Sequence, residues 1–96
     1  MKSQEELLEI LSEQVVEMED EDIVETIQEY IENGYAVDQA VEALIRGMKE
    51  VGDLFAEEEY YVTDVLIAAD AMNNAMDLLK PLMMEKRLPL AVRRKS

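Results

Sequence analysis

The chain contains no cysteine and no histidine, and these two absences remove much of the chemistry open to a small protein. Without cysteine there is no disulfide and no thiolate metal site. Without histidine the chain lacks the commonest transition-metal ligand and the usual general base near neutral pH. No serine, lysine or tyrosine has a visible activating base beside it, so we expect neither a catalytic site nor a metal site in this chain.

Basic side chains and long apolar runs are also scarce. The 96 residues include 23 acidic and 9 basic side chains, and the resulting formal charge of -14 opposes binding to nucleic acid or to an anionic membrane. No apolar run approaches the ~18 residues that a membrane helix needs. Residues 1–30 are too acidic and lack the apolar core of a signal peptide. We therefore expect a soluble cytoplasmic protein.

The few basic side chains are concentrated near the C-terminus. Residues 1–79 hold 22 acidic but only 3 basic side chains, whereas residues 80–96 hold 1 acidic and 6 basic ones. This change in composition near Pro81 predicts one folded domain over residues 1–84 and a loose basic tail over residues 85–96. The acidic run at residues 19–22 lacks the glycine and the spacing of an EF-hand loop, so the carboxylates indicate a solvated face.

Apolar residues recur three and four positions apart along most of the chain, which predicts helices. The expected helices span residues 4–18, 21–33, 38–56 and 64–85. Gly34 is expected to end the second helix, since glycine tolerates the left-handed conformation found there. The longest apolar stripe is expected on the last helix, at Val65, Ala69, Met72, Met76, Leu79 and Met83. Amphipathic helices with short connections predict an all-α fold, a four-helix bundle.

Several residues mark the expected helix ends. Ser3 and Glu6 fit a capping box at the start of the first helix. Residues 60–62 should form an extended link, after which Thr63 would cap the last helix. Pro81 should kink or end that helix near Lys80, because proline removes a main-chain donor and clashes with the preceding turn.

Two glycines, Gly47 and Gly52, lie inside the third expected helix. Each costs about 1 kcal/mol relative to alanine in a helix. One explanation is a tolerated weakness in the helix, and the other is the close approach of another backbone or a flat ligand. The sequence leaves both explanations open.

The most informative stretch is residues 41–83, which contains G-M-K-E-V-G-D-L-F, E-Y-Y-V, A-A-D-A-M and L-K-P-L in that order. Together with the upstream helices and the Asn33-Gly34 turn, these elements resemble the helical cap domain of cobalamin-dependent methionine synthase. They are still more similar to the corrinoid proteins of methanogen and acetogen methyltransferase systems. The resemblance covers residues 1–84, and the joint pattern is specific although each element alone is weak.

This resemblance implies a cofactor and a set of contact residues. In the family, the cap covers the upper face of the corrinoid, shields the methyl–cobalt bond from water and moves aside for a methyltransferase. The resemblance implies that Phe55 and Val62 touch the corrinoid and that Val65 and Leu66 lie nearby. Apolar side chains at such a site exclude water without competing for the cobalt. The alternative is that Phe55 and Val65 are plain core residues, as their positions on the apolar stripes favour.

The chain departs from the family pattern in two places. Thr63 stands where the family usually has proline, so the chain lacks that rigid residue at the start of the last helix. The doubly wound α/β domain with the motif D-x-H-x-x-G, whose histidine ligates the cobalt in the family, is not among the 96 residues. We therefore expect this chain alone to bind cobalamin weakly or not at all.

The sequence thus predicts a non-catalytic cap module of a cobalamin-dependent methyl-transfer system. Its expected partners are a corrinoid-binding α/β domain and a methyltransferase subunit. The alternative is a stand-alone helical protein-interaction module that has lost cobalamin binding. Several apolar residues around the junction of the last two helices are also expected to be exposed and to form a homodimer, since an exposed apolar patch tends to find a partner. These residues are Phe55, Tyr60, Tyr61, Val62, Val65 and Leu66.

Overall fold

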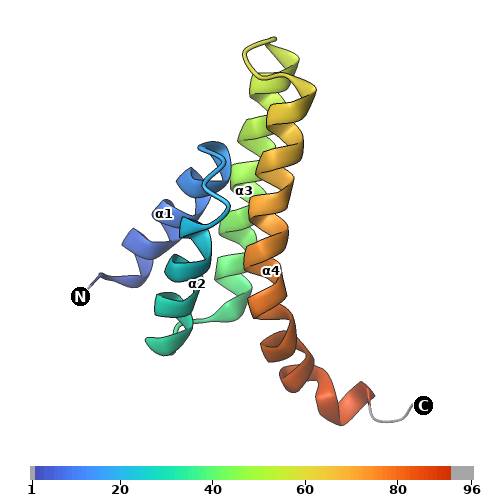
Figure 1. Cartoon of the computed structure of the whole chain (residues 1–96). Helices are drawn as coiled ribbons and strands as arrows, with labels where there is room; N and C mark the ends of the chain where they lie inside the picture. The colour runs from blue at the N-terminus through green and yellow to red at the C-terminus, as the bar shows by residue number, and fades with distance from the viewer. Residues whose placement is uncertain (1, 92–96) are drawn as a thin grey trace.

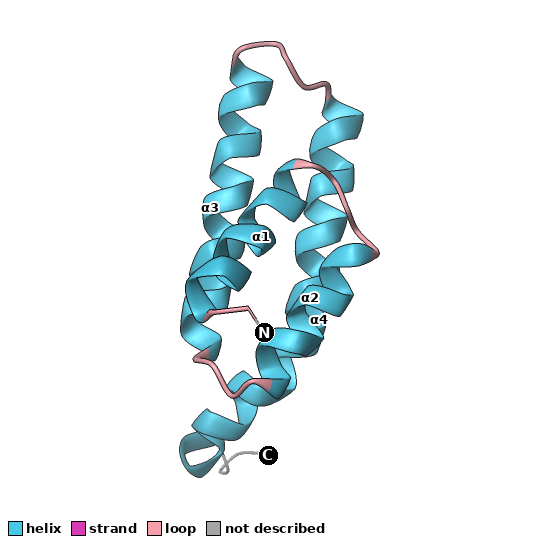
Figure 2. Ribbon diagram, turned by 90° about the vertical axis from the view of Figure 1, so that its left-hand side faces the viewer, coloured by secondary structure: helices cyan, strands magenta, loops and turns pink. Residues whose placement is uncertain are grey.

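The computed structural model describes the backbone of residues 2–91 and the side chains of residues 2–83. The regular secondary structure in this part of the chain is four helices joined by short turns: α1 (Gln4–Val16), α2 (Asp22–Glu32), α3 (Val37–Ala56) and α4 (Val62–Ala91). The long helices α3 and α4 form an antiparallel hairpin, and the shorter α1 and α2 pack beside it (Figure 1). The turn between α3 and α4 projects beyond α1 and α2 (Figure 2). The all-α four-helix prediction is confirmed.

The core is formed by one apolar face from each helix. Leu11 of α1, Ile27 of α2, Leu44 of α3 and Leu79 of α4 are fully buried. The apolar spacing of three and four residues brings such side chains onto one side of each helix, so that each helix covers the others. No polar or charged side chain is buried among residues 2–83. Packing of apolar side chains therefore supplies most of the stability of this bundle.

The buried face of α4 differs from the predicted stripe. Its fully buried residues are Ala68, Ala71 and Ala75, together with the predicted Leu79. The other predicted residues of the stripe are partly buried at the edge of the core. The prediction named the wrong positions because it gave more weight to large apolar side chains than to alanine. Alanine at the contact lets the backbone of α4 lie close to its neighbours, and the methionines fill the remaining gaps.

The N-terminus of α1 has the predicted capping box. The amide of Glu6 donates to Ser3 Oγ at 3.2 Å, and the amide of Ser3 donates to Glu6 Oε1 at 2.9 Å. These two bonds satisfy amides that have no partner inside the helix. The helix ends at Val16, two residues earlier than expected, because Met18 adopts a positive φ of 61°.

The start of α4 was predicted incorrectly. The helix begins at Val62, so Val62 is its first residue and not part of an extended link. The cap is also different, since Thr63 is already inside the helix. Instead, Asp64 Oδ2 accepts a hydrogen bond of 2.9 Å from the amide of Tyr61, the residue before the helix. A carboxylate in the first turn also interacts favourably with the positive end of the helix dipole.

The end of α4 lies later than predicted, and of the two effects expected of Pro81, an end of the helix near Lys80 is wrong. The helix continues through Pro81 to Ala91, beyond the expected end at residue 85. Pro81 removes one main-chain donor, whereas Leu, Met, Glu, Lys and Arg around it favour a helix. The last turns of α4 lead away from the other three helices (Figure 1). The domain boundary after residue 84 stays a prediction, and residues 92–96 of the expected tail lie outside the described residues.

Two glycines have clear structural roles. Gly34 has a φ of 77° after the end of α2, as predicted for a left-handed stop. Gly47 lies where α3 crosses α1, and a Cβ there would lie 2.7 Å from the carbonyl oxygen of Ser12 and 2.8 Å from Cβ of Val15. Of the two explanations for Gly47, close approach of another backbone is therefore correct.

Candidate functional site

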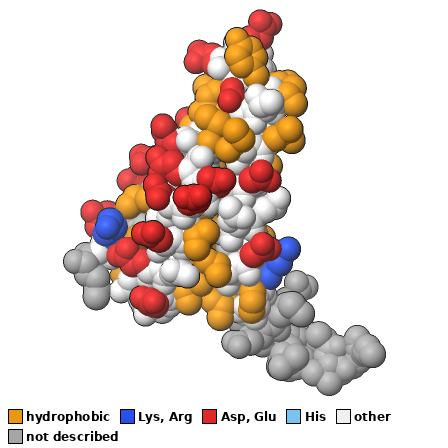
Figure 3. Space-filling model, in the orientation of Figure 1, with side chains coloured by type: hydrophobic (Ala, Val, Ile, Leu, Met, Phe, Trp, Pro, Cys, Tyr) orange, Lys and Arg blue, Asp and Glu red, His pale blue; other side chains and the backbone are white. Residues whose placement is uncertain are grey.

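The most exposed apolar surface lies at the projecting end of the α3–α4 hairpin. We call the side chains of Phe55, Tyr61, Val62 and Leu66 the apolar tip. Their exposed fractions are 46% for Phe55, 74% for Tyr61, 58% for Val62 and 59% for Leu66. Figure 3 shows hydrophobic side chains gathered at this end of the molecule, above a more acidic body. Several large apolar side chains exposed at one place indicate a contact surface.

The four predicted cofactor-contact residues do not all lie in the same environment. Phe55 lies in the last turn of α3, and Val62 and Leu66 lie one turn apart at the start of α4, so these three residues share the tip. Val65 is partly buried and packs against the core. The alternative of a plain core residue therefore fits Val65 and does not fit Phe55. Contact of these residues with a corrinoid stays a prediction.

The turn that carries the apolar tip is fixed by Tyr60. Its hydroxyl donates to the carbonyl oxygen of Val16 at 2.6 Å and so joins the turn to the end of α1. The amide of Tyr60 donates to the carbonyl oxygen of Leu54 at 3.2 Å, and Glu58 takes up a positive φ of 67°. Burial raises the pKa of Tyr60, and the nearby carboxylate of Glu17 adds to this rise, so the hydroxyl remains a donor at neutral pH.

Sequence reasoning missed this role of Tyr60 by placing it among the exposed apolar residues. The signal was a tyrosine at a helix junction, where the ring packs and the hydroxyl needs a partner. Asn74 was missed as well: its Nδ2 donates to the carbonyl oxygen of Asp20 at 3.0 Å. This bond ties α4 to the connection between α1 and α2. The Tyr60 and Asn74 hydrogen bonds therefore help hold the hairpin that bears the tip against the end of α1 and the connection that follows it.

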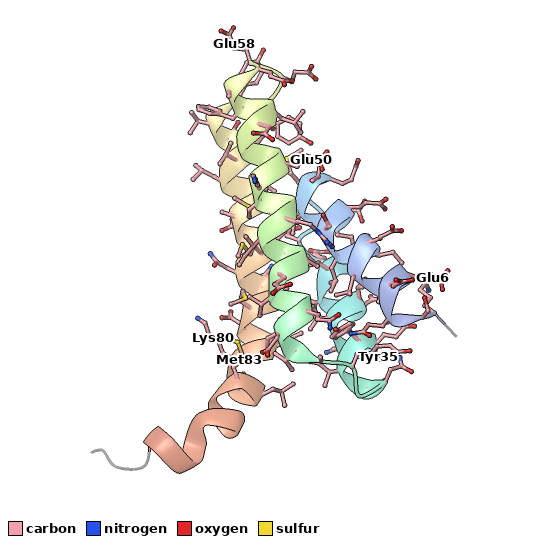
Figure 4. The ribbon with its side chains drawn as sticks, turned by 180° about the vertical axis from the view of Figure 1, so that it is seen from behind. Glu6, Tyr35, Glu50, Glu58, Lys80 and Met83 are labelled. Atoms are coloured by element: carbon pink, nitrogen blue, oxygen red, sulfur yellow. The ribbon has the colours of Figure 1, made fainter. Side chains whose placement is uncertain are left out.

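The turn at the tip carries three consecutive exposed acidic residues, Glu57, Glu58 and Glu59. Glu58 lies at the α3–α4 turn, while Lys80 and Met83 lie near the other end of the bundle (Figure 4). Among residues 2–83 the single ion pair joins exposed Lys80 and Asp77 at 3.7 Å.

Within the described residues, no group of acidic side chains is arranged to hold a metal ion. In that same part of the chain, no helix meets the length and hydropathy needed to cross a bilayer.

The tip is an exposed surface and not an enclosed pocket. Three open grooves found among the described residues lie along α1 instead, and none of these three includes a residue of the tip. The groove near the end of α1 is lined largely by polar residues, among them Glu13, Glu17 and Glu50. The tip presents three apolar side chains and the ring of Tyr61, and such a surface can cover an apolar partner and exclude water from the contact.

Comparison with known proteins gives a family match that covers this surface. The model of a family described as the B12 binding domain matches residues 7–80, which include the whole tip. Trimethylamine corrinoid protein 1 of Methanosarcina acetivorans is 33% identical over 88 residues. The trimethylamine corrinoid protein of Methanosarcina barkeri is also 33% identical over 88 residues. Both comparisons cover 91% of this chain but only 40% of the relative. No solved structure gave a significant match.

Proposed function

The chain belongs to the B12 binding domain family, and from this premise we propose that it is a helical cap that covers the upper face of a corrinoid. This cap would be part of a cobalamin-dependent methyl-transfer system in the cytoplasm. The observation that carries the proposal is the apolar tip, because the family match spans it and nothing in the bundle covers it. The chain spans about 40% of the length of its curated relatives, so the partners below are part of the same proposal.

The residues of the tip fit a corrinoid in their chemistry. Phe55, Val62 and Leu66 present apolar surface, and the chain has no histidine or cysteine that would compete for the metal. A bound corrinoid supplies the cobalt that carries the methyl group. The part of this chain is to exclude water from that face, which slows unwanted hydrolysis and strengthens electrostatic interactions inside the site. The cap itself is proposed to be non-catalytic.

The proposed partners follow from what the cap does not supply. An α/β domain would hold the corrinoid from below and provide the lower cobalt ligand. A methyltransferase subunit would approach the upper face once the cap has moved aside. The relatives are named for trimethylamine, but the proposed contacts of the cap are with the corrinoid, so they do not select the methyl donor.

We expect the isolated chain to bind methylcobalamin weakly, with a Kd above about 1 μM, because binding must offset lost translational and rotational freedom with apolar contacts on one face. The measurement is a titration of the 15N-labelled chain followed by amide chemical shifts. Shifts should concentrate on residues 52–66. Sub-micromolar affinity would contradict the weak binding, and shifts confined to α1 and α2 would contradict the assignment of the tip.

The second candidate function is an interaction module that uses the same tip to self-associate, and the exposure of Tyr61 and Leu66 favours it. Burying apolar area gains about 25 cal/mol per Å², and a typical interface takes about 800 Å² from each partner. The acidic bodies repel each other, but this repulsion is screened beyond ~8 Å at physiological salt. We therefore expect a homodimer that becomes tighter as salt rises.

Sedimentation equilibrium at several salt and protein concentrations checks the homodimer. Leu66→Glu places a charge in the tip without touching the core, so this variant should remain monomeric at every salt concentration. Lys80→Glu also adds negative charge, but far from the tip, and should leave the dimer in place. A wild-type chain that stays an 11.0 kDa monomer throughout would refute self-association.

A further inference from the structure

Gly52 is the one glycine of α3 that the packing of the described residues does not explain. A Cβ at Gly47 would collide with α1, whereas a Cβ at Gly52 would meet no atom within 4 Å. Gly52 is exposed and has no positive φ, so neither its backbone conformation nor its neighbours require glycine. Glycine inside a helix nevertheless lowers stability relative to alanine. The fold of this chain alone would therefore favour alanine at residue 52.

The position of Gly52 links it to the apolar tip. Residues three and four apart are neighbours on a helix surface, so Gly52 lies between Met48 and Phe55 on one side of α3. Ile45, which is 53% exposed, lies three residues before Met48 and continues the same side by about one more turn. Gly52 is thus a gap in a row of apolar side chains that leads along α3 to the tip. Leu66, near the start of α4, lies at the same end of the hairpin.

We propose that Gly52 is a contact residue for the corrinoid, at which the flat macrocycle approaches the backbone of α3 more closely than a Cβ would allow. This inference rests on the proposed function and adds a residue that sets how the cap fits its ligand. Phe55 and Leu66 would contact the ring beside this point. Glycine permits such a close approach because it has no side chain to hold the ligand away.

Gly52→Ala tests the proposal because it should change stability and binding in opposite directions. Alanine favours the helix and meets no atom of the bundle, so the equilibrium constant for folding should rise, by up to about five-fold. The added methyl group should weaken binding of methylcobalamin at least five-fold in the amide-shift titration. Gln39→Ala also adds an alanine to the exposed surface of α3, but far from the tip, and should leave the affinity unchanged.

Each outcome of this experiment is decisive. If the wild-type tip responds to methylcobalamin and Gly52→Ala binds equally well, the role of Gly52 is wrong while the proposed cap function stands. If the wild-type chain shows no response at the tip, the same comparison is made with this chain in place of the matching segment of the Methanosarcina barkeri trimethylamine corrinoid protein. If the tip does not respond to methylcobalamin there either, the proposed function fails, and the inference fails with it. A variant that loses stability together with binding would also overturn the inference, because Gly52 would then serve the fold.

Discussion

Replacing Leu44 with alanine is expected to lower the free energy of unfolding by about 2–5 kcal/mol. Leu44 is fully buried in the middle of α3, and its loss would leave a cavity among the core side chains of the bundle. Domains of this kind have a total stability of only about 5–15 kcal/mol, so the change removes a large part of it. Urea unfolding followed by circular dichroism at 222 nm gives the value directly.

Phe55→Ala is the matched control for Leu44→Ala, because both remove a large apolar side chain from α3. Replacing a phenylalanine that is buried in a core with alanine costs about 3–5 kcal/mol of stability. Phe55, however, is 46% exposed. We expect this variant to lose much less stability than Leu44→Ala, about 1 kcal/mol or less. If Phe55→Ala unfolds as readily as Leu44→Ala, then Phe55 is a core residue and the tip has been misassigned.

Gly47→Ala is expected to destabilise the bundle by up to about 2 kcal/mol, because overpacking that forces backbones apart costs about 1–3 kcal/mol and the better helix propensity of alanine offsets about 1 kcal/mol. The added Cβ would lie 2.7 Å from the carbonyl oxygen of Ser12, which belongs to the backbone of α1 and cannot rotate away. The cost of this overpacking should therefore exceed the gain in helix propensity. The same urea experiment measures the change.

Gly52→Ala, in the same helix, is expected to raise the free energy of unfolding, whereas Gly47→Ala should lower it. The two variants make the same chemical change, but a Cβ at Gly52 meets no atom within 4 Å. The difference between their free energies of unfolding therefore isolates the contact between α1 and α3 from helix propensity. Equal stabilisation by both substitutions would mean that α1 does not approach α3 closely at Gly47.

Much of the fold could be predicted from local sequence signals. The capping box at Ser3 and Glu6 and the stop at Gly34 involve neighbouring residues and were both confirmed. The buried face of α4 could not be predicted in the same way, because Ala68, Ala71 and Ala75 are buried by neighbouring helices whose positions the spacing does not give. The helix through Pro81 shows a similar limit, since the residues around a proline decide whether the helix continues.

The candidate site was predicted less completely than the fold. The motif resemblance led to Phe55, Val62 and Leu66, which the structure places together as exposed side chains. It did not separate them from Val65, because only the packing of α4 against the core decides which of these neighbouring residues is exposed. The hydroxyl of Tyr60 bonds a backbone oxygen 44 residues earlier in the chain, a contact that no local pattern predicts.

The measurement that tests the central claim most directly is photolysis of a methyl–cobalt bond beneath the cap. A chimera would carry this chain in place of the matching segment of the Methanosarcina barkeri trimethylamine corrinoid protein and would be loaded with methylcobalamin. The proposal predicts that, in water and under steady light, the chimera loses the methyl group more slowly than the same protein with the segment deleted. It also predicts that Phe55→Ala removes much of this protection while the chimera stays folded. Equal rates with and without this chain would contradict the proposal that it covers the upper face of the corrinoid.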